Sequence, residues 1–151
     1  MPDATDRRIL RQLLADPGIG NAELAQRAGV TPASLWRRLE RLRDSGVIQA
    51  TETRIDWRKL GYEVQVSLRF TLDKSHPRAF DDFIAAARLV PEVTEIQTFL
   101  GSVDFRLSVI ARDMAHWQQI YRDSILTLPH VSDSDALMLV STIKDVQELP
   151  L

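Results

Sequence analysis

The spacing of Ala25, Gly29 and Leu35 constrains this chain more than any other feature of its sequence. Ala25 is small where two helices would have to approach closely, and Gly29 follows four residues later, where a turn would lie. Leu35 comes six residues after the glycine and would point back into the core. A helix-turn-helix needs these features at these offsets, because its second helix must cross the first tightly. Any pair of short helices joined through a glycine is the alternative, and the spacing favours the helix-turn-helix.

Capping signals predict two helices ahead of the turn. We expect Thr5 to cap the first helix and residues 16–18, with the sequence Asp-Pro-Gly, to stop it. Asn21 is expected to cap the second helix, and Gly29 to end it in a backbone conformation with positive φ. The apolar faces expected of these helices are Ile9, Leu10, Leu13 and Leu14 in the first and Ala22, Leu24, Ala25 and Ala28 in the second.

The third predicted helix follows directly. Thr31 is its expected cap, and Pro32 stands at the first helical position, where a missing N–H costs nothing. The helix is expected to run to about Arg43 and to be closed by Gly46. Its buried stripe is expected to be Leu35, Leu39 and Leu42.

A different face of this third helix carries a hydroxyl and three guanidinium groups, at positions 34, 37, 38 and 41. Arginine suits phosphate and the O6/N7 edge of guanine, because its planar fork donates two hydrogen bonds at once. A solvated charged face is the alternative, but such faces usually mix signs, and Glu40 lies well round the helix from this one. We therefore predict a surface that binds double-stranded DNA. Its candidate residues are Thr31, Ala33, Ser34, Trp36, Arg37, Arg38 and Arg41.

The distribution of charge is compatible with that prediction. The chain has a net charge of −2, yet residues 1–60 hold eleven Lys and Arg against eight Asp and Glu, a net of +3. Residues 61–151 hold eight against thirteen, a net of −5. Because attraction to phosphate depends on where the charge lies, only the first part suits nucleic acid. Small surface imbalances of this size are also common, so charge alone does not decide.

Residues 47–56 are predicted to form a short hairpin, the wing of a winged helix-turn-helix, although its turn lacks an Asn-Gly or Asp-Gly signal. Residues 57–61 are predicted to be a connector. The expected organisation is a DNA-binding domain with connector over residues 1–60 and a second domain over residues 61–151.

The second part of the chain predicts a ferredoxin-like β-α-β-β-α-β domain, which gives the chain an α+β fold class. Apolar and polar residues alternate strictly in its first strand, and apolar residues recur at every second position of its third. Helices are expected on one face of the sheet, and the other face, rich in Val, Leu and Phe, is expected to favour oligomerisation. The predicted elements are a strand over 64–72, a helix from Pro77 to before Pro91, strands over 93–100 and 105–111 separated by a turn over 101–104, a helix capped by Asp113 and ended by Pro129, and a strand over 135–143.

Signatures of other chemistry are missing from the sequence. There is no cysteine, no phosphate-binding glycine loop and no hydrolase motif, and the three histidines at 76, 116 and 130 have no metal-like partner at helical spacing. No apolar run approaches the roughly 20 residues that a membrane helix needs. The opening residues lack the pattern of a signal peptide. We therefore expect no catalytic residues, no metal, no cofactor and no membrane, and a cytoplasmic protein.

Several short motifs, in this order and spacing, resemble the leucine-responsive regulatory protein/AsnC (feast/famine) family over nearly the whole chain. They lie at both ends and at the predicted turn of the second domain. They are Asp6-Arg7-Arg8-Ile9-Leu10, Asn21-Ala22-Glu23-Leu24-Ala25, Arg37-Arg38-Leu39, Gly46-Val47-Ile48, Lys59-Leu60-Gly61, Gly101-Ser102-Val103-Asp104-Phe105, Lys144-Asp145 and Leu149-Pro150-Leu151.

The resemblance implies a bacterial or archaeal transcription regulator that binds DNA through its third helix and forms homodimers that join into octamers or related rings. It also implies an amino-acid-like effector bound between subunits near the turn formed by Gly101, Ser102, Val103 and Asp104. A glycine there lets a backbone N–H approach a carboxylate, and Asp104 could meet an α-ammonium group; an ordinary β-turn is the alternative. Ser102 and Glu40 depart from residues common in the family, which bears on effector identity and on one phosphate contact.

A second hypothesis is an enzyme. Proteins that resemble this family and share its two domains decarboxylate siroheme-type tetrapyrroles, with histidines and arginines lining a cleft of the sheet. No histidine lies in a predicted strand here, and the arginine face of the third helix would have no purpose. A pure assembly module that has lost its DNA is a third possibility.

Overall fold

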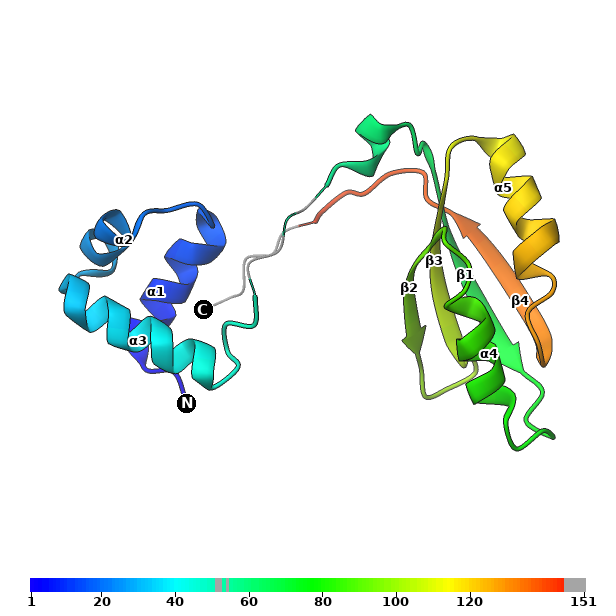
Figure 1. Ribbon diagram of the computed structural model, residues 1–151, viewed down its shortest axis with the longest axis horizontal. Helices are drawn as coiled ribbons and strands as arrows, with labels where there is room; N and C mark the ends of the chain where they lie inside the picture. The colour runs from blue at the N-terminus through cyan, green and yellow to red at the C-terminus, as the bar shows by residue number, and fades with distance from the viewer. Residues whose placement is uncertain (51–52, 54, 146–151) are drawn as a thin grey trace. The chain divides into compact units, whose positions relative to one another are not determined.

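The computed structural model describes residues 1–50, 53 and 55–145. The chain forms two compact units, which are described separately (Figure 1). The described residues up to Thr53 belong to the first unit, together with residues 143–145, and Ile55–Thr142 form the second. The first unit thus ends a few residues before the boundary predicted at residue 60.

The described part of the first unit contains three helices, α1 (Ala4–Ala15), α2 (Asn21–Ala28) and α3 (Pro32–Asp44) (Figure 1). The predicted helix-turn-helix spacing is confirmed. Gly29 adopts a left-handed conformation with φ of 65°, which a residue without Cβ takes at little cost. The helices share one apolar core made of Ile9, Leu24, Ala25, Ala28, Leu35 and Leu39.

Two of the predicted helix caps are wrong. Asp3, not Thr5, caps α1, because its carboxylate accepts the backbone N–H of Asp6 at 2.8 Å while the Asp6 carboxylate accepts the N–H of Asp3 at 3.0 Å. Thr5 lies inside the first turn instead. Asn21 is the first residue of α2 rather than its cap, and Gly20 occupies the cap position without a side-chain bond.

The cap of α3 is as predicted, since Thr31 Oγ1 accepts the N–H of Ser34 at 3.2 Å. The predicted wing differs from its prediction in the residues that the structure describes. The described residues of the predicted hairpin, 47–50, 53, 55 and 56, form no strand, and residues 51, 52 and 54 lie outside the described part. The connector forms a short 3₁₀ helix, η1 (Trp57–Leu60), which Gly61 ends with φ of 87°.

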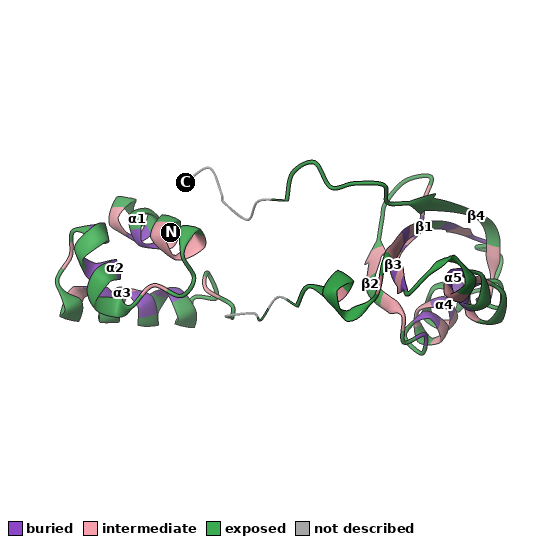
Figure 2. Cartoon of the chain, turned by 90° about the horizontal axis from the view of Figure 1, so that it is seen from above, coloured by how far each residue is buried: buried purple, intermediate pink, exposed green. Residues whose placement is uncertain are grey.

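The second unit is a four-stranded antiparallel sheet with helices on one face (Figure 2). The strand order is β2-β3-β1-β4, the arrangement of a ferredoxin-like fold. The predicted order of strands and helices is therefore confirmed. The elements are β1 (Val64–Leu72), α4 (Ala79–Ala87), β2 (Val93–Thr98), β3 (Phe105–Ala111), α5 (Met114–Ile120), which continues as the π-helical turn η2 (Tyr121–Ile125), and β4 (Val131–Met138).

The core of this unit lies between the sheet and its helices. The alternating apolar residues of β1 and β3 are buried there, and the ring of Phe83 in α4 lies 5.1 Å from that of Phe70 and 4.7 Å from that of Phe105. The face rich in Val, Leu and Phe, which we expected to be open, is thus covered within the chain. The other face carries the intervening residues, which in β1 are Gln65, Ser67, Arg69 and Thr71. The prediction that this apolar sheet face is open and favours oligomerisation is therefore wrong.

The last strand also differs from its prediction. β4 covers Val131–Met138 rather than residues 135–143, and it pairs with β1 at the edge of the sheet. Residues 132–135 of the strand are Ser-Asp-Ser-Asp, and no apolar alternation appears because nearly all of the strand is exposed. The apolar stretch that suggested a strand continues past β4 and stays exposed in the single chain, with Val140 and Ile143 both 93% exposed.

Smaller differences concern helix and strand ends. α4 begins at Ala79, after a turn that includes Pro77, and β2 ends at Thr98 rather than at residue 100. No helix in the described part of the chain is long and apolar enough to cross a membrane.

Candidate functional site

The outer surface of α3 holds all the residues predicted to contact DNA. Leu35, Leu39 and Leu42 fix the helix to the core, being 4% exposed or less. The turns between these leucines therefore face away from the core. Thr31, Ala33, Trp36, Arg37 and Arg41 are exposed, whereas Ser34 and Arg38 are half-buried.

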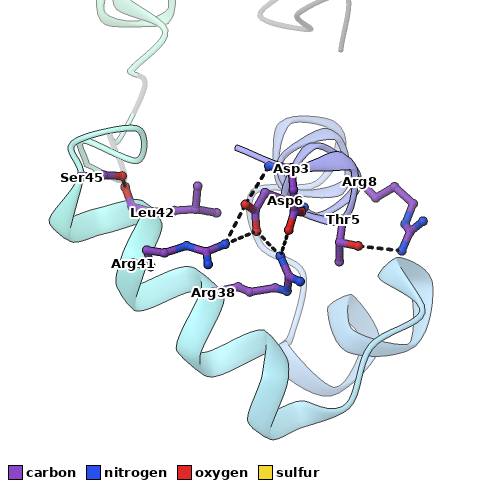
Figure 3. Close-up of polar contacts among 8 residues, drawn as sticks. All are labelled: Asp3, Thr5, Asp6, Arg8, Arg38, Arg41, Leu42 and Ser45. Atoms are coloured by element: carbon purple, nitrogen blue, oxygen red, sulfur yellow. Dashed lines mark hydrogen bonds and ion pairs between the residues drawn. The ribbon is translucent and has the colours of Figure 1, made fainter. Parts of the chain in front are cut away.

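Two of the three arginines on this surface are bound to carboxylates from the start of α1 (Figure 3). Arg38 Nη1 donates to Asp3 Oδ2 and to Asp6 Oδ1, each at 2.7 Å. Arg41 Nη2 donates to both carboxylate oxygens of Asp6, at 3.0 and 2.8 Å. The helix taken alone suggested a surface with positive charge only. With these carboxylates beside the arginines, the surface carries charges of both signs. The sequence could not show this, because the carboxylates lie more than thirty residues away along the chain.

The environment of these carboxylates keeps both ionised. The hydrogen bond from Arg38 and then that from the Asp6 N–H lower the pKa of Asp3 to about 2. Burial raises the pKa of Asp6, whose side chain is only 2% exposed, but the Asp3 N–H and Arg38 outweigh it and lower the value overall. In turn, the carboxylates raise the pKa of Arg38. The four charged groups form one network that closes α1 against α3.

Arg37 is the arginine that this network leaves out. It is exposed, and within residues 1–50, 53 and 55–145 its side chain makes no hydrogen bond or ion pair. A shallow hollow of about 240 Å³ lies beside it, lined by Ser34, Arg37, Arg38 and Arg41. Hydroxyl and guanidinium donors around such a hollow suit a phosphate oxygen.

A second candidate site is a pocket of about 440 Å³ in the second unit. It lies where the turn between β2 and β3 meets the open face of the sheet. The turn residues Gly101, Ser102 and Val103, all predicted to bind an effector, line it. Its other lining residues are Ser67, Arg69, Phe99, Leu100, Arg106 and Leu137.

Asp104, the fourth predicted effector residue, does not line this pocket. It is 3% exposed, and its Oδ2 accepts the N–H of Leu72 at 2.9 Å while its Oδ1 pairs with Lys74 Nζ at 2.8 Å. Burial raises the pKa of Asp104, but the Leu72 N–H and Lys74 outweigh it and leave the value lowered. The carboxylate thus ties the end of β1 to the start of β3, as a structural turn residue does.

The two arginines of the pocket are not among the residues predicted from the sequence to bind an effector. Arg69 in β1 and Arg106 in β3 lie directly opposite each other in the sheet register, on its open face. Arg106 makes a contact of 3.4 Å to Glu95, and its Nε is buried with no hydrogen-bond partner in the described structure. The alternation places both residues on polar faces. Their pairing could not be read from the sequence, because β1 and β3 are not consecutive strands.

The histidines lie elsewhere. His130 Nε2 lies 3.0 Å from Asp82 Oδ2, and the ring of His76 is 4.6 Å from that of His130. His116 Nδ1 accepts the backbone N–H of Arg112. Within the described ranges, no group of three or more His, Asp or Glu side chains is arranged to hold a metal ion. The pocket lining contains two arginines and no histidine, whereas the decarboxylase hypothesis expects both residue types.

Comparison with family models assigns a role to each unit. Residues 2–49 match the winged helix-turn-helix DNA-binding model, and residues 65–149 match the Lrp/AsnC ligand binding domain. The chain therefore combines a DNA-binding domain with a domain for a small-molecule ligand.

Curated relatives and solved structures match the whole chain. The transcriptional regulator AzlB of Bacillus subtilis is 31% identical over 151 residues, 100% of this chain and 96% of that protein. The leucine-responsive regulatory protein of Salmonella typhimurium is 29% identical over 147 residues, 97% of this chain and 90% of that protein. A transcriptional regulator from Neisseria meningitidis, solved in complex with L-methionine, superposes with a TM-score of 0.89 at 27% identity and covers 99% of this chain and 97% of its own. These relatives are regulators and not enzymes, and the chain belongs to the Lrp/AsnC family of transcription regulators.

Proposed function

We propose that this regulator contacts its operator through the exposed surface of α3 and changes its DNA binding when an amino acid occupies the pocket beside Gly101. Such a protein acts where the chromosome is, in the cytoplasm of a bacterial or archaeal cell. The DNA part of the proposal rests on one observation. Two of the three arginines on the surface of α3 are bound to carboxylates, and the third is not.

Arg37 is the arginine best placed to reach a base or a phosphate, because no carboxylate of the described residues pairs with its guanidinium. Thr31, Ala33, Ser34 and Trp36 flank it on the same exposed turns and complete the proposed contact surface. Arg41 is 60% exposed despite its bond to Asp6, which leaves part of its guanidinium for phosphate. Arg38, only 24% exposed and bound to two carboxylates, serves as a positioning residue that fixes the angle of α3.

An amino acid as the effector is supported by the pocket and by the relative that was solved with L-methionine. Gly101 has φ of 155°, and no atom beyond its two chain neighbours lies within 4 Å of where a Cβ would stand, so its backbone is open toward a ligand. Phe99, Leu100 and Leu137 provide apolar surface for a side chain. The effector acts by favouring one arrangement of subunits, since a ligand shifts an equilibrium only by its differential affinity for the two states.

A homo-oligomer, either a dimer or an octamer made of dimers, is part of the proposal. Its support is the exposed apolar stretch at and after the end of β4, in which Leu137, Met138 and Leu139 are at least 40% exposed and Val140 is 93% exposed. Apolar surface of this kind is seldom left in water. Val140→Asp is expected to shift the full chain toward smaller species in light scattering.

Fluorescence anisotropy with a duplex recovered by in vitro selection tests the DNA part. Arg37→Ala is expected to weaken binding by about 1–3 kcal/mol if Arg37 reads a base, or to flatten the salt dependence if it contacts phosphate. Arg122→Ala is the matched control, because Arg122 is an exposed arginine of the other unit. If Arg37→Ala left both the affinity for DNA and its salt dependence unchanged, α3 would not be the surface that contacts DNA.

The effector part is tested by a thermal-shift screen of the amino acids, followed by the same anisotropy titration with each hit. A hit should change DNA affinity in the wild type. Gly101→Leu should remove the change, because bulk blocks the approach to the backbone and a side chain strains this φ. Absence of any amino acid that alters either measurement would contradict the proposed effector class.

A further inference from the structure

The effector pocket holds two positive charges side by side. Arg69 and Arg106 occupy directly opposed positions of β1 and β3, both on the open face of the sheet. Like charges in this position repel and are destabilising by themselves. Arginine in pairs is the usual means of holding a carboxylate, because each guanidinium offers two parallel donors.

Neither guanidinium is fully engaged within the described structure. Arg69 is exposed and makes no hydrogen bond or ion pair there. Arg106 has only the 3.4 Å contact to Glu95 through Nη2, and its buried Nε donates to nothing in that part of the chain. A buried donor without an acceptor is unfavourable, because it has lost its hydrogen bonds to water without replacement. A small turn of this side chain toward an anion would satisfy Nε and Nη together.

Two carboxylates that lie beside these arginines do not line the pocket. Glu95 touches the far end of Arg106, and Asp135 lies opposite Arg69 in the register of β4, yet neither belongs to the lining. Asp104, which was expected to meet an α-ammonium group, is turned away and bound to Leu72 and Lys74. The lining that one chain provides thus offers two cations to the head of a ligand and no anion.

From this arrangement we infer that Arg69 and Arg106 hold the carboxylate of the ligand beside an apolar surface for its side chain, and that binding does not require an α-ammonium group. The ligand class is therefore apolar 2-oxo acids as well as the corresponding amino acids. The inference rests on the proposed effector role of this pocket. A 2-oxo acid carries one net negative charge, whereas a zwitterionic amino acid carries none, so two guanidinium groups attract it more strongly. At about 5 Å in water, one unit charge is worth roughly fourfold in affinity.

Calorimetry with the full chain tests this directly. The probes are leucine, methionine and phenylalanine, each paired with the 2-oxo acid of the same side chain. We expect each 2-oxo acid to bind at least as tightly as its amino acid. Arg69→Gln and Arg106→Gln should each weaken the 2-oxo acid by about tenfold or more, the usual loss for a hydrogen bond to a charged group. Arg122→Gln removes one charge elsewhere in the same unit and should have no effect.

The outcomes separate this inference from the proposed function. Amino acids that bind while their 2-oxo acids bind more weakly would overturn the inference and leave the effector role intact. Binding that neither arginine variant weakens would overturn the assignment of this carboxylate site. If no member of either class binds the wild type, the proposed effector role fails together with the inference.

Discussion

Arginine has opposite surroundings in the two units of this chain. In the first unit, Arg38 and Arg41 meet the carboxylates of Asp3 and Asp6, and the pairs close one helix against another. In the second unit, Arg69 and Arg106 lie opposite each other, and the described residues give the pair one ion pair, the 3.4 Å contact of Arg106 to Glu95. The difference teaches that an arginine's partners, rather than its position on an element, decide whether it stabilises the fold or remains available for a ligand.

Removal of the central carboxylate of the first unit should have the largest effect on stability. Asp6→Ala leaves Arg41 unpaired, deprives Arg38 of one of its two partners and removes half of the capping box. We expect a loss of about 2–4 kcal/mol in the free energy of unfolding, within the range for breaking a buried pair together with a cap. Urea unfolding of the full chain, followed by the helical signal, measures it. Glu40→Ala, on the exposed side of α3, is the control, and an equal loss in both variants would refute the network.

The buried carboxylate of the second unit should have a smaller effect. Asp104→Ala orphans the N–H of Leu72 and frees Lys74, and we expect a loss of about 1–3 kcal/mol, the usual consequence of an unsatisfied buried donor. Since Asp104 does not line the pocket, effector affinity should stay within about threefold at a temperature where the variant is folded. Loss of effector binding without loss of stability would instead place Asp104 at the ligand.

Acid should destabilise the first unit by protonating the carboxylates of Asp3 and Asp6. The pKa of Asp3 is about 2 in the folded chain, below its ordinary value of 3.8, and that of Asp6 is also lowered. A depressed folded pKa stabilises the protein above the unfolded value, and this stability is lost as the pH falls from about 3.8 toward 2. Asp3→Asn should therefore flatten the decline of the melting temperature over that range. A decline as steep as in the wild type would mean that other groups control it.

Neutralising an arginine of the second unit should have the smallest effect. Arg69→Gln removes one of two facing like charges but also the attraction to Asp135 on the other side. We expect these terms to cancel to within about 0.5 kcal/mol in the free energy of unfolding. Arg38→Ala, by comparison, should be clearly destabilising. Similar losses in the two variants, measured by the same urea titration, would remove the distinction between the units.

Local patterns predicted most of the fold. The turn at Gly29, the cap at Thr31 and the alternation in β1 and β3 each depend on a few neighbouring residues, and each is confirmed. The wrong predictions concern elements whose structure depends on residues far away in the sequence. β4 is a polar edge strand held by backbone pairing to β1, so its sequence has no apolar alternation.

The same reason limits what could be predicted of the candidate sites. The turn at residues 101–104 was identified correctly, but the role of Asp104 depends on Leu72 and Lys74, which precede it by about thirty residues. Likewise, the partners of Arg38 are set by the packing of α1 on α3. A charge pattern on one helix identifies a polar face, whereas the packing of a second element decides which of its charges are free.

The two adjacent arginines of α3 provide the most direct test of the central claim, that partners divide structural from DNA-contacting arginines. Arg37→Ala and Arg38→Ala are compared by thermal midpoint and by anisotropy with the selected duplex, at a temperature where both are folded. We predict that Arg37→Ala keeps the wild-type midpoint and loses about tenfold or more in DNA affinity. Arg38→Ala should lower the midpoint by several degrees and lose less affinity. The opposite result, an unchanged midpoint with the larger loss of DNA affinity in Arg38→Ala, would contradict the claim.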